Sequence, residues 1–235
     1  MDLLKQNALK MGIDITRNQL DKFNIYYKEL ITWNRRTNLT AITNYEDVQI
    51  KHFLDCLTLI PYVKLNKGTQ VIDIGSGGGF PGIPLKISYP DIELALIEST
   101  GKKAQFLKHL LSALEIDGVE VIQGRAEEIA SHPKYREQYD IAIIRAVGTL
   151  STVLELTLPF CKIGGLSISF KKAGIDDEIK HAQNISEILG GLFDSTHEIN
   201  KSIFPDKRQL VFFRKVSPAP SKYPRKPGIP SKRPL

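Results

Sequence analysis

The chain has 235 residues, of which 42% are hydrophobic and 25% charged, proportions typical of a soluble globular protein. No apolar run approaches the roughly 20 residues of a membrane-spanning helix, and Met1–Lys10 lacks the apolar block of a signal peptide. We therefore expect a cytoplasmic protein without a membrane partner. The formal net charge of +6 permits an anionic partner but does not establish one.

Cysteine usage gives no sign of a disulfide or a metal site. Cys56 and Cys161 lie far apart in apolar surroundings, which indicates buried free thiols. No cluster of histidines and cysteines has the spacing of metal ligands, so we expect no metal.

Residues 1–65 have helical periodicity and form the first of three expected segments, a helical extension. Thr16 and Gln19 match a capping box at the start of a helix. Apolar residues then recur at helical spacing: Leu20, Phe23, Tyr27 and Leu30. The more polar stretch Trp33–Thr40 is predicted to be a loop. A further helix is predicted over Asp47–Ile60, and a structural role is favoured for its His52.

The chain is organised around the stretch 71–82, where an apolar run ends in an acid and a glycine cluster follows. This order is typical of a strand, a tight turn and the start of a helix. Glycines allow positive φ and leave the backbone open to a ligand, and the helix start offers free N–H groups to an anionic group.

Two nucleotide-like ligands compete for this loop. The dinucleotide pattern Gly-x-Gly-x-x-Gly fits only from Gly77, two residues too late after the strand. The acid-x-Gly-x-Gly-x-Gly pattern of S-adenosylmethionine (SAM) enzymes fits in register through Asp73, Gly75, Gly77 and Gly79. The spacing therefore favours SAM over a nicotinamide dinucleotide.

From about Gly68 onward, strands and helices alternate, which defines the second expected segment, residues 66–215. Strands are predicted at 71–74, 94–98, 119–122, 139–144 and 166–170, followed by a closing pair at 196–204 and 209–214. Helices are predicted at 82–89, 99–114, 150–160 and 175–189. This alternation predicts an α/β fold with a mostly parallel sheet.

Four candidate ligand residues fall at or just beyond the carboxyl ends of the predicted strands, where open parallel sheets bind their ligands. They are Gly75, Glu98, Ala126 and Arg145. Glu98, about 20 residues past the glycines, is placed to hold ribose hydroxyls. Arg145 is placed to bind a carboxylate or phosphate, or to donate to a base edge.

Residues 216–235 form the third segment, a basic proline-rich tail without an acid. Its prolines exclude a helix or a central strand. Two interpretations remain open, a disordered tail and an extended strap that meets RNA phosphates. Its basic residues are Lys222, Arg225, Lys226, Lys232 and Arg233.

Motifs spread over nearly the whole chain carry a family resemblance. They are Trp33-Asn34, Asn38-Leu39-Thr40, His52 with Asp55, Asp73–Gly82, Gly101-Lys102-Lys103, Arg125–Glu128, Arg145-Ala146 and Tyr223–Gly228. The Phe80-Pro81-Gly82 extension is much more specific than a generic SAM loop. The set resembles the RsmG (GidB) methyltransferases, which methylate N7 of a guanine (guanine 527 in the family) in the 16S ribosomal RNA of the small subunit.

The resemblance implies a Rossmann-like methyltransferase fold with a seven-stranded, mostly parallel sheet, and SAM as cofactor. It places SAM contacts at Gly75, Phe80, Ala126, Glu127 and Arg145. It implies 16S rRNA in the small ribosomal subunit as the partner. Separately, we expect the enzyme to be a monomer. The chain departs from the family in having Glu98 where aspartate is usual and Cys56 where serine is usual; a glutamate still reaches a ribose diol.

The expected mechanism is methyl transfer by positioning. Guanine N7 has a free lone pair and needs no general base, so alignment with the methyl group supplies most of the rate. No Asn-Pro-Pro-Tyr-like motif follows the fourth strand, which argues against methylation of an adenine or cytosine amino group. No cysteine lies where the nucleophile for 5-methylcytosine formation would, which argues against covalent catalysis. Arg145 is the candidate catalytic residue, placed near the SAM carboxylate, a phosphate or guanine O6.

The RNA contacts and the alternatives complete the prediction. RNA-binding candidates are Lys171, Lys172 and the tail cations Lys222, Arg225, Lys226, Lys232 and Arg233. Three other functions remain open on the residues alone. They are SAM-dependent methylation of a small molecule or protein, NAD-dependent oxidoreduction, and RNA binding without catalysis.

Overall fold

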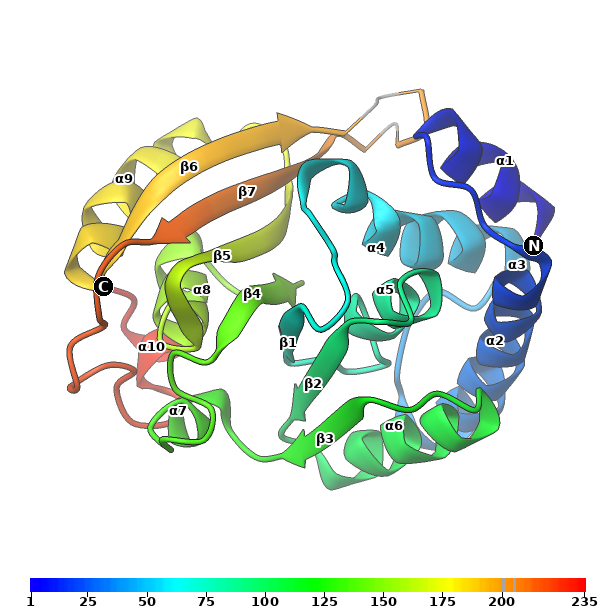
Figure 1. Ribbon diagram of the computed structural model, residues 1–235, viewed down its shortest axis with the longest axis horizontal. Helices are drawn as coiled ribbons and strands as arrows, with labels where there is room; N and C mark the ends of the chain where they lie inside the picture. Colours follow the sequence, from blue (N-terminus) through cyan, green and yellow to red (C-terminus); the bar gives the residue numbers. More distant parts are fainter. Residues whose placement is uncertain (200–201, 205) are drawn as a thin grey trace. The chain divides into compact units, whose positions relative to one another are not determined.

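The computed structural model describes residues 1–199, 202–204 and 206–235. Its strands form a seven-stranded sheet flanked by helices, so the predicted α/β class is confirmed (Figure 1). The chain groups into two compact units, one of residues 1–69 and 76–123 and the other of residues 70–75 and 124–235. The glycine-rich stretch thus passes from the second unit into the first.

The first unit contains the parallel strands β2 (Glu93–Glu98) and β3 (Val119–Gln123), both predicted. Its helices are α1 (Asp2–Lys10), α2 (Arg17–Thr37), α3 (Tyr45–Val48), the π-helical segment η1 (Gln49–Leu54), α4 (Asp55–Leu57), the 3₁₀ turn η2 (Ile60–Tyr62), α5 (Gly82–Ser88) and α6 (Gly101–Ala113). The expected helical extension therefore shares a compact unit with the helices that follow the glycine stretch.

Helix α2 begins at the predicted capping box, in which the Thr16 side chain and Gln19 satisfy each other's backbone N–H groups. It runs to Thr37, so the predicted loop is wrong for residues 33–37. The helix ends because Asn38 adopts the left-handed conformation, with φ of 47°. Asn34 Oδ1 accepts the N–H groups of Leu39 and Thr40 at 2.6 and 2.9 Å and holds the chain reversal that follows.

The second unit contains five strands in the order β1 (Gln70–Ile74), β4 (Tyr139–Arg145), β5 (Cys161–Lys172), β7 (Arg208–Lys215) and β6 (Gly191–Glu198). Strands β1, β4 and β5 are parallel, and β7 runs antiparallel to both of its neighbours. The helices of this unit are α7 (Ala126–Ile129), α8 (Leu150–Thr157), α9 (Asp176–Ile188) and α10 (Ile229–Lys232). The apolar strand β4 lies between two others, as its composition predicts.

Two predictions near the C-terminus are wrong. Strand β6 begins at Gly191, five residues before the predicted start at Thr196, and residues 200 and 201 of the predicted strand lie outside the described residues. The tail contains the short helix α10, contrary to the prediction that its prolines exclude a helix. Pro230 occupies the first turn of α10, where a missing N–H costs nothing.

Cys56 and Cys161 are buried free thiols, as expected. Burial raises the pKa of the Cys161 thiol to about 12. Within residues 1–199, 202–204 and 206–235, no three His, Cys, Asp or Glu side chains are grouped to hold a metal ion. In the same ranges, no helix has both the length and the apolarity needed to span a membrane.

Candidate functional site

Glu98 joins the glycine loop to the end of β2 within the first unit. Its side chain is only 6% exposed. One carboxylate oxygen, Oε2, accepts the N–H of Gly77 at 2.9 Å, and Oε1 accepts the N–H of Thr100 at 2.7 Å. Each carboxylate oxygen can accept a second hydrogen bond, so this anchored carboxylate suits the two hydroxyls of a ribose diol.

Gly79 must be glycine for two separate reasons. Its φ of +94° lies in a region that side-chain-bearing residues rarely adopt. A Cβ there would lie 2.6 Å from Tyr26 Oη and 2.8 Å from Ile83 Cδ1. The close approach of Tyr26 is itself useful, because its hydroxyl donates to the Gly78 carbonyl at 2.6 Å. Helix α2 therefore holds the glycine loop in place.

Phe80 is packed among aromatic rings of the N-terminal helices. Its ring stacks on Tyr26 at 5.4 Å between centroids and on His52 at 4.5 Å. His52 Nε2 is 2.7 Å from Thr40 Oγ1, which supports the structural role expected for this histidine. Phe80 is 9% exposed, so its ring forms part of the loop's support.

Sequence reasoning missed Tyr26 and assigned the inward position to Tyr27. Tyr26 is fully buried, whereas Tyr27 is partly exposed. The spacing of Phe23, Tyr26 and Leu30 is also helical, so the pattern contained the signal. The two adjacent tyrosines could be distinguished only by the glycine loop that lies against one of them.

The second unit contains the other predicted cofactor residues. Asp73 is fully buried in β1, and Gly75, with φ of +74°, follows the end of that strand. Ile74 of β1 and Ile144 of β4 are paired in parallel register, so Gly75 and Arg145 follow at the same edge of the sheet. The structure thus brings together these two residues, which sequence reasoning placed at strand ends.

Ala126 and Glu127 begin α7, and both are buried. The Glu127 carboxylate accepts the N–H of Gly228 at 2.9 Å. A tail residue therefore contacts one of the predicted cofactor residues. Nothing in the local sequence pattern indicates this contact, since the two residues are 101 positions apart.

The predicted RNA-binding cations divide into two groups. Lys171 donates to the Gly148 carbonyl at 2.7 Å and to Glu178 at 3.0 Å, and Arg225 is ion-paired with the fully buried Glu155. These two cations have partners inside the unit. The cations at the other five predicted positions have no ion pair in the described part of the chain: Lys172, Lys222, Lys226, Lys232 and Arg233.

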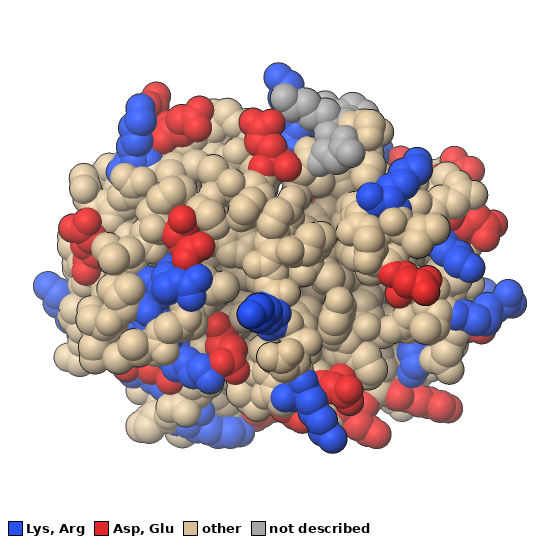
Figure 2. Space-filling view, turned by 45° about the horizontal axis from the view of Figure 1, so that its top comes forward, with Lys and Arg blue, Asp and Glu red and all other residues tan. Residues whose placement is uncertain are grey.

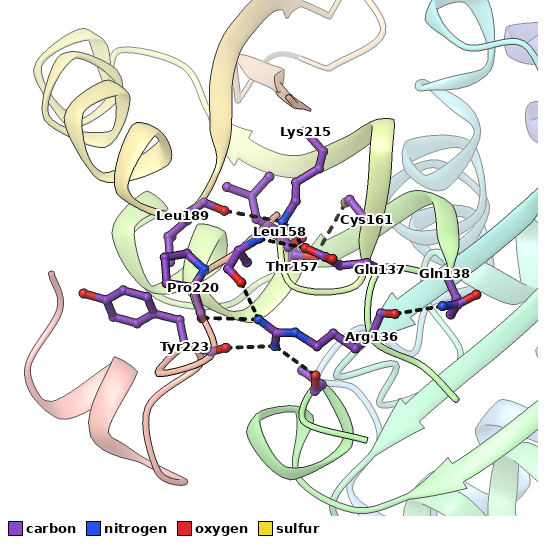
Figure 3. A network of polar contacts seen from close by, with 12 residues as sticks. Arg136, Glu137, Gln138, Thr157, Leu158, Cys161, Leu189, Lys215, Pro220 and Tyr223 are labelled. Carbon is purple, nitrogen blue, oxygen red and sulfur yellow. Dashed lines mark hydrogen bonds and ion pairs between the residues drawn. The ribbon is translucent and has the colours of Figure 1, made fainter. Parts of the chain in front are cut away.

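The tail is held within the second unit by a network of polar contacts that is half-buried at Arg136 and Glu137 and fully buried at Lys215 (Figure 3). Arg136 donates to the backbone carbonyls of Tyr223 and Ala219 at 2.9 and 2.8 Å. Glu137 accepts the N–H of Ala219 at 2.7 Å and pairs with the fully buried Lys215 at 3.0 Å. Burial lowers the pKa of Lys215, and its hydrogen bond to Glu137 opposes that shift. The tail is therefore a folded part of this unit.

Charges on the molecular surface are mixed in sign. Figure 2 shows lysine and arginine side chains interspersed with acidic ones over the face that it presents. Net charge alone therefore does not locate an anionic partner on this face, and the local environment of each cation has to be considered.

Comparison with known proteins gives consistent results. A family model described as rRNA small subunit methyltransferase G (GidB) matches residues 19–211. Ribosomal RNA small subunit methyltransferase G of Dehalococcoides mccartyi strain BAV1 is 45% identical over 235 residues, covering 100% of both chains. The protein of the same name from Pelotomaculum thermopropionicum is 41% identical, covering 100% of this chain and 98% of its own.

Solved structures at low sequence identity share the fold. TYW2 of M. jannaschii, determined in complex with AdoMet, matches with a TM-score of 0.52 at 18% identity, over 64% of this chain and 71% of its own. MtNAS, determined in complex with MTA and tNA, matches with a TM-score of 0.56 at 16% identity, over 91% of this chain and 75% of its own. At these identities the matches establish the architecture.

Proposed function

Because the chain belongs to the rRNA small subunit methyltransferase G family, we propose that it methylates N7 of one guanine in 16S rRNA (guanine 527 in the family). Family membership makes the protein an rRNA methyltransferase with SAM as its methyl donor, and its Rossmann-like sheet agrees with this. This assignment favours methyl transfer over the nicotinamide-dependent reaction that the glycine spacing left open.

The observation that supports SAM binding most directly is the anchored carboxylate of Glu98. It is buried, it holds the glycine loop through Gly77, and it retains acceptor capacity for ribose hydroxyls. Gly79 lets the loop pack closely on the side chains of Tyr26 and Ile83, which keeps its backbone in a fixed position. The residues that we propose to bind SAM are Asp73, Gly75, Gly77, Gly79, Phe80, Glu98, Ala126, Glu127 and Arg145.

The proposed chemistry needs little from the protein beyond alignment. SAM supplies an electrophilic methyl group on a good leaving group, and guanine N7 offers a lone pair without loss of a proton. The chain therefore has to hold the base in line with the methyl group, which contributes on the order of several kcal/mol. We propose that Arg145 binds the SAM carboxylate, an RNA phosphate or guanine O6, because a cation against the ring would oppose its developing positive charge.

We propose that the substrate is RNA in the small ribosomal subunit and that the enzyme acts in the cytoplasm as a monomer. Lys172, Lys226, Lys232 and Arg233 have no internal ion pair in the described residues, which supports a role in phosphate binding. Lys171 and Arg225 would have to exchange their internal partners for RNA. The target guanine has to be unstacked to reach the methyl group.

The test is transfer of labelled methyl from SAM to small subunits purified from a strain that lacks this gene. The RNA is digested and the modified nucleoside is identified by mass. We expect N7-methylguanosine at a single site. Label on another base would refute the guanine mechanism, and absence of SAM binding would refute the assignment of the glycine loop.

A further inference from the structure

The first unit has two stretches that contain cations but no acids. Neither residues 30–45 nor residues 99–114 contain an aspartate or a glutamate. The first stretch includes Arg35 and Arg36, and the second includes Lys102, Lys103 and Lys108. The first stretch covers the C-terminal part of α2, and the second contains α6. Not every helical cation of this unit faces solvent; for example, Lys86 is buried and donates to the carbonyls of Pro90 and Ile92 at 2.8 and 2.6 Å.

Contacts between α2 and α6 show that the two helices run antiparallel. Lys22 near the start of α2 donates to the carbonyl of Leu114 at the end of α6. Further along α2, Glu29 is 2.7 Å from His109. Trp33 then packs on Phe106, with ring centroids 5.7 Å apart.

Successive contacts pair later residues of α2 with earlier residues of α6. The C-terminal end of α2 therefore lies beside the N-terminal end of α6 (Figure 1). Arg36 is one turn beyond Trp33, and Lys102 is one turn before Phe106, so both follow the faces that make the contact. We call the end defined by Arg35, Arg36, Lys102 and Lys103 the α2–α6 cationic end.

The cations at this end have no acidic partner. Among the described residues, the side chains of Arg35, Arg36, Lys102 and Lys103 form no ion pair. Arg36 lies over the Trp33 ring, 6.0 Å from its centroid. That contact orients the guanidinium without neutralising it. Four like charges without counter-ions suit a polyanion that brings its own phosphates.

The α2–α6 cationic end is close to the proposed ribose-binding acid. The Glu98 carboxylate accepts the N–H of Thr100, the residue that precedes α6. Lys102 and Lys103 therefore lie in the first turn of the helix that Glu98 anchors. A polyanion held here would border the proposed methyl-donor site on the first unit.

We propose that the α2–α6 cationic end binds phosphates of the rRNA substrate next to the target guanine. This inference rests on the proposed function, of which it specifies the substrate-binding surface. Phosphate contacts fix the register of a nucleic acid without reading its sequence, so the expected role is presentation of the base. The interface lies on the N-terminal helices and α6, in addition to the tail cations that sequence reasoning selected.

The test compares two triple variants that each remove three positive charges. The first is Arg36→Gln, Lys102→Gln and Lys103→Gln. The matched control is Lys5→Gln, Lys64→Gln and Lys67→Gln, exposed cations of the same unit. Lys64 and Lys67 lie near the start of β2, because the N–H of the following Gly68 donates to the carbonyl of Asp91 just before that strand. Glu98 is at the opposite end of β2.

We expect the first triple variant to raise KM for small subunits at least about tenfold, while kcat and the Kd for SAM stay within about twofold. The slope of log KM against log salt should fall by about 2–3, since each lost phosphate contact removes roughly 0.7–0.9. The control should shift KM less than about twofold. Equal shifts in both variants, an unchanged KM in the first, or a loss confined to SAM affinity would overturn the proposal.

Direct binding to small subunits separates this inference from the proposed function. If the wild-type protein binds subunits but transfers no methyl group to guanine, the proposed function fails, and the interface is still judged by the Kd of the two variants. If methyl transfer is normal and both variants bind subunits like the wild type, the interface fails and the proposed function stands.

Discussion

Replacing Arg225 with alanine tests whether the tail is a folded part of the second unit. The Arg225 guanidinium contacts both oxygens of Glu155, with Nε at 2.9 Å and a terminal nitrogen at 2.6 Å, and the backbone N–H of Arg225 adds a bond of 2.8 Å. Glu155 is fully buried, so Arg225→Ala leaves a buried carboxylate without its counter-charge. Removing one partner of a buried pair costs about 3–5 kcal/mol.

For a chain of this size, a loss of about 3–5 kcal/mol lowers Tm by roughly 6–20 °C. Thermal unfolding followed by circular dichroism measures this change. Lys226→Ala is the matched control, because the neighbouring Lys226 is exposed and should change Tm by no more than about 1–2 °C. The double variant Arg225→Met, Glu155→Leu should recover most of the loss, since it removes both charges.

A change below about 0.5 kcal/mol on Arg225→Ala would refute the buried pair and support a disordered tail. A small change in stability together with a large rise in KM for small subunits would instead assign Arg225 to RNA. The reasoning above requires the opposite result, a large loss of stability at this position.

Three further predictions concern the glycine loop and the buried thiol. Glu98→Gln leaves one oxygen for the N–H groups of Gly77 and Thr100, so it should weaken SAM binding by about 10- to 100-fold in calorimetry and cost about 1–3 kcal/mol of unfolding free energy. Unchanged SAM affinity would remove Glu98 from the site. Gly79→Ala should cost about 2–5 kcal/mol of stability in denaturant unfolding, from positive φ and the clash of its Cβ, whereas an unaffected variant would contradict the loop geometry. The Cys161 thiol, with its pKa raised to about 12, favours the folded state below pH 9, and this contribution is lost as the pH rises toward 12. Between pH 9 and 10, the wild type should lose up to about 1.4 kcal/mol more unfolding free energy than Cys161→Ala, and identical pH profiles would contradict this.

Local patterns were sufficient for most elements and for the chemical type of the site. The capping box at Thr16 and the run that ends at Asp73 predicted a helix and a strand because each depends on residues within one or two turns. The family resemblance supplied the reaction, and the family model and relatives support it at the level of rRNA methylation. Local signals were weak in residues 33–37 of α2 and at the start of β6, where predictions were wrong. A third error, helix α10, arose because a proline is compatible with the first turn of a helix.

Only the tertiary structure decided which side chains support the site and which cations are neutralised. Composition makes Arg225 and Lys102 equivalent basic residues, yet the fold pairs Arg225 with the buried Glu155 and leaves Lys102 without an acid. Tyr26 was likewise distinguished from Tyr27 only by the carbonyl of Gly78, 52 positions away. A charge or hydroxyl acquires its role from partners distant in sequence, because burial and hydrogen bonding depend on position in space.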